Sequence, residues 1–168
     1  MGSLAGQTHP PEAVWITVFG GEVRKELRDE FDTFLRGYTG ETKFEFVSGT
    51  MSLGYYGRIQ IGLQATTPYT VFLDDDCMPG NQFFANSLKI LGTREYRGLL
   101  GIKGHRTDLE MIDLEYFGPL DKTNYIVEAD VVGGAWIVET GWVRLAFATR
   151  HFTWGTGEDY TWCANLRK

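Results

Sequence analysis

The fold is decided by a stretch in the middle of the chain, where residues 69–76 read YTVFLDDD. Its first five residues are aromatic, β-branched or aliphatic, which is typical of a buried strand. Three aspartates follow at once, so the strand would present them at its carboxyl end, where open α/β sheets bind their ligands. Because side chains alternate along an extended backbone, we expect Asp74 and Asp76 to point to the same side.

Strand-then-helix units surround this stretch. Apolar runs predict strands at residues 14–19 and 43–47, and apolar residues at helical spacing predict helices at residues 22–36, 54–65 and 84–91. Such units need crossover helices between parallel strands. We therefore expect an α/β fold, a single Rossmann-like domain with a mostly parallel central sheet flanked by helices.

The second half of the chain has a less regular pattern. Residues 98–102 predict a strand, residues 104–124 are polar and loop-like, and residues 127–138 are apolar. Helices are expected over residues 142–148 and 158–168.

Composition and charge limit the function classes. The chain has 168 residues, which favours one domain, and its 43% hydrophobic and 23% charged residues indicate a folded chain. Sixteen Lys and Arg residues against 22 Asp and Glu residues give a net charge of −6. This balance argues against binding to nucleic acid or to an anionic membrane.

The cysteines and the hydropathy pattern bear on location. Cys77 and Cys163 lie far apart in sequence, so neither a disulfide framework nor a zinc site is indicated, and a reducing compartment is expected. No apolar run approaches the ~18 residues of a transmembrane helix. We expect a cytoplasmic protein, in the host cytoplasm if it is viral, or a soluble piece of a longer polypeptide.

The acidic tract itself has two interpretations. Two converging carboxylates suit a hard divalent cation such as Mg²⁺ or Mn²⁺, which takes oxygen ligands. A solvated acidic turn is the alternative, since aspartate is common in turns. Three like charges at a strand end repel one another, which lowers stability. A solvated turn can form without three adjacent aspartates, so their presence favours the metal interpretation.

Four segments, in order, resemble GT-A-fold glycosyltransferases with an aspartate-x-aspartate motif. They are GRIQIGL at residues 57–63, LDDDCMPG at 73–80, DVVGGAW at 130–136 and TGEDY at 156–160. The resemblance spans about residues 15–168 and is strongest to small catalytic domains of algal or large-DNA-virus type. GT-A domains are commonly longer, so we expect a reduced acceptor region or a polypeptide that continues beyond Lys168.

The resemblance implies an activity and a division of the chain. The activity is Mn²⁺- or Mg²⁺-dependent transfer of a sugar from a nucleotide-sugar, commonly a UDP-sugar, to a hydroxyl of a glycan or glycoprotein, with inversion. Residues 14–92 would form the nucleotide-sugar-binding half and residues 93–168 the acceptor and catalytic half of one domain. Residues 1–13 are expected to be a flexible tail.

The resemblance also implies roles on the donor side. The donor-side candidates are Thr17, Phe19, Gly20, Arg58, Asp74 and Asp75. Asp74 would face the ribose and also the metal, Asp76 would bind the metal directly, and the role of Asp75 stays open. Arg58 is interpreted as a diphosphate or base contact, because its planar fork suits phosphate, or else as an exposed helix arginine.

The catalytic candidates are Asp159 and Glu158. The resemblance implies that Asp159 is the general base and that Glu158 orients the acceptor. A structural alternative is a capping box, in which Thr156 caps the helix and Asp159 reaches back to its start.

The remaining candidates would lie on the sugar and acceptor side. They are Asp130, Gly133, Gly134, Trp136 and Trp154. Trp136 would stack on a sugar or belong to the core, whereas Trp154 is the better acceptor platform.

A short basic cluster, Lys103, His105 and Arg106, is interpreted as a flap over the diphosphate or, in preference, as a solvated loop. His105 or His151 would complete a metal shell, and their spacing does not choose between them.

Two other functions remain open. A Mg²⁺-dependent phosphatase of the haloacid-dehalogenase type also has an aspartate-x-aspartate tract after an apolar strand. Met78 two residues after Asp76, and the position of the tract on the third strand, count against it. A non-enzymatic sugar-binding module would use the aromatic residues but needs no acidic triplet.

Overall fold

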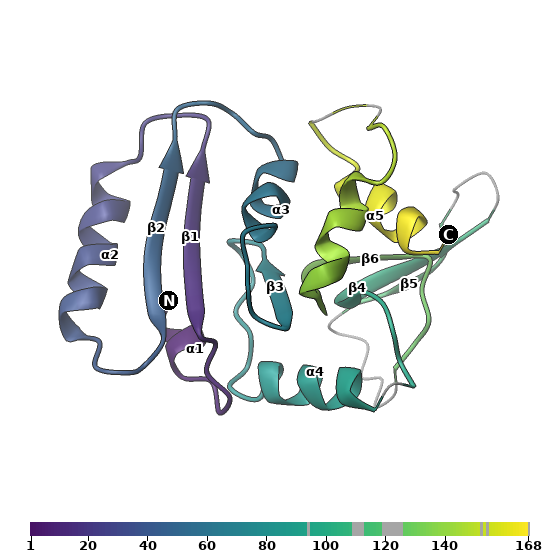
Figure 1. The fold of residues 1–168 in the computed structure, drawn as a ribbon, viewed down its shortest axis with the longest axis horizontal. Helices are drawn as coiled ribbons and strands as arrows, with labels where there is room; N and C mark the ends of the chain where they lie inside the picture. The colour runs from purple at the N-terminus through teal and green to yellow at the C-terminus, as the bar shows by residue number, and fades with distance from the viewer. Residues whose placement is uncertain (94, 109–112, 119–125, 152, 154, 168) are drawn as a thin grey trace. The chain divides into compact units, whose positions relative to one another are not determined.

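The computed structural model describes residues 1–93, 95–108, 113–118, 126–151, 153 and 155–167 (Figure 1). The chain divides into two compact units that interleave in sequence. One unit comprises residues 1–57 and 78–96, and the other comprises residues 58–77 and 97–168. The boundary expected after residue 92 is thus replaced by a division in which residues 58–77 belong with the C-terminal part of the chain.

The first unit contains a small parallel sheet. Its elements are α1 (Gly2–Ala5), β1 (Ala13–Phe19), α2 (Lys25–Gly37), β2 (Lys43–Gly49) and α4 (Phe83–Gly92). β1 pairs with β2 in parallel, from Ala13 opposite Lys43 to Phe19 opposite Gly49. α2 lies beside β2 in Figure 1 and packs on it through aromatic rings, whose centres are 5.4 Å apart for Phe31 and Phe46.

The segment expected to be a flexible tail is attached to the first unit. Gln7 is 6% exposed, and its amide group donates hydrogen bonds to the carbonyl oxygens of Ser3 at 2.9 Å and Gly80 at 2.8 Å. The side-chain oxygen of Gln7 accepts the Phe84 N–H at 3.2 Å. The buried Gln7 amide, together with the hydrogen bonds from Thr8 to the Asn81 carbonyl, ties residues 1–13 to the start of α4, and no local sequence pattern reveals these contacts.

The second unit contains an antiparallel sheet. Its strands are β3 (Tyr69–Leu73), β4 (Leu100–Thr107), β5 (Asp113–Phe117) and β6 (Val131–Glu139), in the order β3-β6-β4-β5. Each neighbouring pair in this sheet is antiparallel.

The α/β class is confirmed, but the expected mostly parallel central sheet is wrong. Among the described residues only β1 and β2 pair in parallel, and they form a separate two-stranded sheet. The physical reason is β6, which hydrogen-bonds β3 on one edge and β4 on the other and runs opposite to both. Lys103, His105 and Arg106 consequently lie in β4 instead of in the predicted loop.

Helices and a shared aromatic core complete the second unit. Its helical elements are η1 (Thr140–Phe147), α5 (Glu158–Leu166) and most of α3, which spans Tyr56–Gly62 and crosses the unit boundary. The ring of Trp162 on α5 lies 5.5 Å from that of Phe72 and 5.8 Å from that of Trp136. This contact fixes the start of α5 near the carboxyl end of β3. No helix in the described part of the chain is both long and apolar enough to cross a membrane.

Candidate functional site

The acidic residues lie in a turn that directly follows β3. The Cys77 N–H donates to the Asp74 carbonyl at 3.0 Å, which closes the turn, and the Asp74 N–H donates to the Gly134 carbonyl of β6 at 3.4 Å. The Cys77 thiol also donates to the Gly134 carbonyl, at 3.2 Å. The turn is therefore attached to β6 by two contacts at one carbonyl group.

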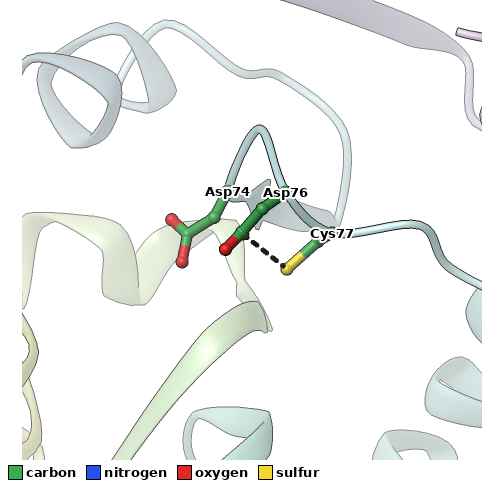
Figure 2. Close-up of side chains that lie close together, drawn as sticks. All are labelled: Asp74, Asp76 and Cys77. Atoms are coloured by element: carbon green, nitrogen blue, oxygen red, sulfur yellow. Dashed lines mark hydrogen bonds between the residues drawn. The ribbon is translucent and has the colours of Figure 1, made fainter.

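The turn brings three potential metal ligands together (Figure 2). Asp74, Asp76 and Cys77 each offer one atom, and these atoms lie within 4.8 Å of one another. Two oxygens bound to one Mg²⁺ ion lie at most about 4.2 Å apart, so small side-chain rotations are enough to bring these atoms onto one ion. Asp75 is exposed in the same turn and does not belong to the group.

Cys77 was not predicted to belong to this group, although its position directly after the three aspartates was a signal for it. Burial raises the pKa of the Cys77 thiol above its usual value, and the charges of Asp74 and Asp76 raise it further. The two carboxylates are thus the natural ligands for a hard cation, and the thiol lies beside them in its neutral form.

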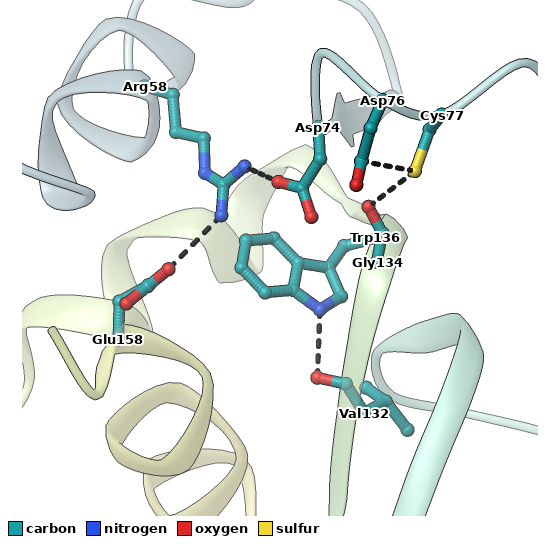
Figure 3. Close-up of polar contacts among 8 residues, drawn as sticks. All are labelled: Arg58, Asp74, Asp76, Cys77, Val132, Gly134, Trp136 and Glu158. Carbon is teal, nitrogen blue, oxygen red and sulfur yellow. Dashed lines mark hydrogen bonds and ion pairs between the residues drawn. The ribbon is translucent and has the colours of Figure 1, made fainter. Parts of the chain in front are cut away.

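Arg58 connects the acidic turn to the start of α5 (Figure 3). One outer nitrogen of its guanidinium, Nη1, is ion-paired with Oδ1 of Asp74, and the other, Nη2, lies 3.1 Å from Oε1 of Glu158. The carbon at the centre of the guanidinium is 4.4 Å from the centre of the Trp136 ring. Arg58 therefore joins two predicted site residues that are 84 positions apart in the sequence.

Trp136 belongs to the core. It is 3% exposed, and its indole N–H donates to the Val132 carbonyl at 2.8 Å. The core role, one of the two predicted for this residue, is therefore the one that the structure shows. Its ring faces Arg58 instead of offering a surface on which a sugar stacks.

The start of α5 differs from the predicted capping box. The residue before the helix is Gly157, with φ +80°, and no side chain caps the helix. Only glycine adopts this conformation without strain, which explains the glycine at this position. Oδ1 of Asp159 accepts the N–H of Tyr160 at 2.9 Å, so neither Thr156 nor Asp159 makes the predicted capping contact.

Glu158 and Asp159 lie in different environments. The Glu158 side chain is 9% exposed, and burial raises the pKa of its carboxyl above the usual value, while its own backbone N–H and Arg58 oppose that shift. Asp159 is half-buried and has no cationic partner among the described residues. The buried acid is paired and the more accessible acid is not.

Asp130 is held by the chain on both sides. Its Oδ2 accepts the Thr107 N–H at 2.8 Å, and its Oδ1 is ion-paired with Arg167. The hydrogen bond from Thr107, followed by the contact with Arg167, lowers the pKa of the Asp130 carboxyl below its usual value. The predicted acceptor-side residue thus joins β4, the start of β6 and the end of α5.

Gly133 and Gly134 shape β6 where it meets the acidic turn. The register between β4 and β6 shifts between Gly101 and Lys103, and Gly134 has φ +82°. A Cβ atom at Gly134 would lie 2.9 Å from the Ile102 side chain. The glycine pair therefore allows a bulge that presents the Gly134 carbonyl to the turn.

Three of the predicted donor-side residues, Thr17, Phe19 and Gly20, lie in the first unit. Thr17 and Phe19 are near the end of β1, and Gly20 follows with φ +91°. The Gly20 N–H donates to the Gly49 carbonyl at 3.2 Å, and a Cβ at Gly20 would meet Ser52 at 3.1 Å. Gly20 therefore forms a tight turn at the end of β1, which favours a glycine at this position.

The other predicted candidates do not join the acidic group. In the described ranges, the one set of three or more potential metal ligands is Asp74, Asp76 and Cys77, so His105 and His151 are not part of such a set. The His105 ring lies 4.9 Å from that of Tyr116, and the His151 ring lies 5.5 Å from that of Phe147. Trp154 lies outside the described residues.

Comparisons with known proteins do not assign this chain to a family. The chain matches no family model, and it matches no curated protein. Among solved structures it is similar to the crystal structure of HddC from Yersinia pseudotuberculosis, with a TM-score of 0.46 and 11% sequence identity. The alignment covers 83% of this chain, and the chain spans 60% of the length of that one.

Proposed function

We propose that the protein is a metal-dependent glycosyltransferase that transfers a sugar, with inversion, from a UDP-sugar to a hydroxyl of a glycan or glycoprotein. The observation that carries this proposal is that Arg58 contacts both Asp74 and Glu158. The acidic tract expected to bind the donor and the acidic pair expected to act on the acceptor are thereby linked within the second unit.

The donor set fits a divalent cation. Asp76 is exposed and forms no ion pair with another described residue, and Asp74 uses only Oδ1 for Arg58. The oxygens of these two carboxylates suit Mn²⁺ or Mg²⁺, and both metals also accept phosphate oxygens. When bound, the cation would supply neutralising charge to the diphosphate of the leaving group.

Asp159 is the proposed general base. It lies in the first turn of α5 and is more exposed than the neighbouring Glu158, so an acceptor hydroxyl can reach it. As the acceptor oxygen bonds to the anomeric carbon, the hydroxyl proton passes to Asp159, and the bond from that carbon to UDP breaks. Glu158 is buried and paired, so the accessible Asp159 is the better base.

A cytoplasmic location is part of the proposal. Cys77 and Cys163 are both free, and burial raises the pKa of Cys163 to about 11. Free thiols persist in a reducing compartment, which supports the cytoplasm.

The proposal is tested by following both products of the reaction. The protein is incubated with UDP-sugars and hydroxyl acceptors in Mn²⁺, and released UDP and inorganic phosphate are measured separately. We expect UDP release that requires both the acceptor and the metal. Phosphate release from phosphate monoesters would favour a phosphatase, and glycan binding without UDP release would favour a binding module. Glu115→Gln, in the exposed pair with Arg106, is a matched control for acidic substitutions in the site.

A further inference from the structure

Arg58 was predicted to touch the donor, but its contacts within the chain indicate a different role. We infer that Arg58 is a positioning residue that orients the Asp74 carboxylate for the donor, and that Glu158 anchors Arg58 instead of touching the acceptor. This inference rests on the proposed function, and it assigns separate roles to the two acids at the start of α5.

The guanidinium is fixed from several directions. Its outer nitrogens each face a different carboxylate, on Asp74 and Glu158, and the Trp136 ring lies 4.4 Å from its central carbon. The Trp136 ring is itself held by its hydrogen bond to Val132. The Arg58 side chain is only 20% exposed, so its fork is directed at the chain and little of it is available to a diphosphate.

Glu158 has the properties of an anchor. Its side chain is 9% exposed, and Trp162, one turn further along α5, is fully buried. A group that receives a proton from an acceptor must be within reach of that acceptor, and the neighbouring Asp159 is the more exposed of the two. Glu158 therefore acts through Arg58. Substitution of Glu158 should weaken UDP binding only in a protein that still has Arg58.

Substitutions separate this role from a direct donor contact. A lysine ammonium binds phosphate well as a point charge, but it cannot replace a planar fork that bridges two carboxylates. Arg58→Lys should thus impair positioning while it would preserve a phosphate contact. Glu158→Met removes the acceptor for Nη2, whereas Glu158→Gln keeps a carbonyl oxygen there and cannot act as a base.

The experiment measures the dissociation constant of UDP in Mn²⁺ for the full chain, together with the unfolding midpoint of each variant. We expect Arg58→Lys and Glu158→Met each to weaken UDP binding about tenfold, and the double variant to be no weaker than Arg58→Lys alone. Glu158→Gln should stay within about twofold of the wild type, because its amide oxygen still accepts from Arg58. Glu115→Met, in the exposed pair with Arg106, is the matched control and should not change the affinity.

Three results would overturn the inference: wild-type affinity in Arg58→Lys, wild-type affinity in Glu158→Met, or losses that multiply in the double variant. If Glu158→Met does not fold, Arg58→Lys decides alone, since it keeps the positive charge beside Asp74 and Glu158. Failure of the proposed function is distinguishable, because it would appear as absence of metal-dependent UDP binding in the wild-type protein.

Discussion

Two acidic regions of the second unit differ in what occupies their carboxylates. Asp130 accepts a backbone hydrogen bond from Thr107 and is paired with Arg167, so both of its oxygens are used within the chain. Asp76 lies in the exposed turn after β3, and among the described residues its carboxylate contacts the Cys77 thiol, at 3.7 Å, and forms no ion pair.

This difference distinguishes Asp130, an acid that stabilises the fold, from Asp76, an acid that is free to bind a ligand. The partners of Asp130 lower the pKa of its carboxyl, which means that its negative charge stabilises the fold. Asp76 lies beside Asp74 without a cation of its own, and such repulsion lowers stability. A ligand that brings positive charge offsets this cost, so the turn is suited to binding and Asp130 to holding strands together.

Asp76→Asn should have the largest effect. It keeps the size of the side chain but removes the charge that binds the metal, so the transfer rate should fall at least about 10³-fold, as expected when several kcal/mol of metal stabilisation are lost. The unfolding midpoint should stay the same or rise, because a repelling carboxylate is gone. Rates of UDP release and thermal unfolding measure the two effects. Full activity, or a variant that does not fold, would make Asp76 a structural residue like Asp130.

Asp159→Asn should reduce the transfer rate by about 10²–10⁴-fold while UDP binding is retained, because the base is lost and the donor site is not. Single-turnover transfer and UDP affinity are measured on the same preparation. Since no side chain caps α5, stability should change little. Near-normal transfer by this variant would remove Asp159 as the base.

Asp130→Asn should give the opposite result to Asp76→Asn. The free energy of unfolding should fall by about 1–3 kcal/mol at pH 7, because the half-buried Thr107 N–H and Arg167 lose a charged partner, while UDP affinity should stay unchanged. The pKa of the Asp130 carboxyl in the folded protein lies below the usual value for an aspartate, so its contribution to stability is present above that usual value and is lost as the pH falls through the folded pKa. Urea unfolding between pH 7 and pH 3 should therefore show the two proteins converging in acid. Loss of UDP affinity would place Asp130 in the site after all.

Glu158→Gln should have the smallest effect on stability, a gain of under about 1 kcal/mol at pH 7. The pKa of Glu158 is raised in the folded state, so the folded protein binds its proton more tightly and the wild type loses stability as the pH rises above 4.5. The variant lacks this loss, and its advantage should disappear below pH 4.5. Urea unfolding at both pH values measures it. A variant that is less stable at pH 7 would show that the charge of Glu158 is needed by Arg58.

The sequence predicted local elements well and their partners poorly. The alternation and composition around residues 69–73 located β3 and its acidic end, because strand propensity and turn chemistry are local. The antiparallel direction of the strands was not predicted, because it depends on β6 pairing with β3 on one side and β4 on the other. Short apolar runs look alike in parallel and antiparallel sheets, so the sequence did not reveal this pairing.

The same reason applies to the candidate site. Its acids were found from residue type and spacing, but a single sequence does not show that Arg58 lies against Trp136 or that Arg167 reaches Asp130. Asp76 and Asp130 are each an aspartate next to a strand, and only their three-dimensional partners tell them apart.

The central claim is tested most directly by the stability of the wild-type protein with UDP in Mn²⁺ and in EDTA. At a UDP concentration a hundredfold above the dissociation constant measured in Mn²⁺, the free energy of unfolding should rise by about 2.7 kcal/mol with the metal. The same UDP concentration in EDTA should give almost no increase. Equal stabilisation in both buffers, or none in either, would contradict a metal-dependent nucleotide-sugar site at the end of β3.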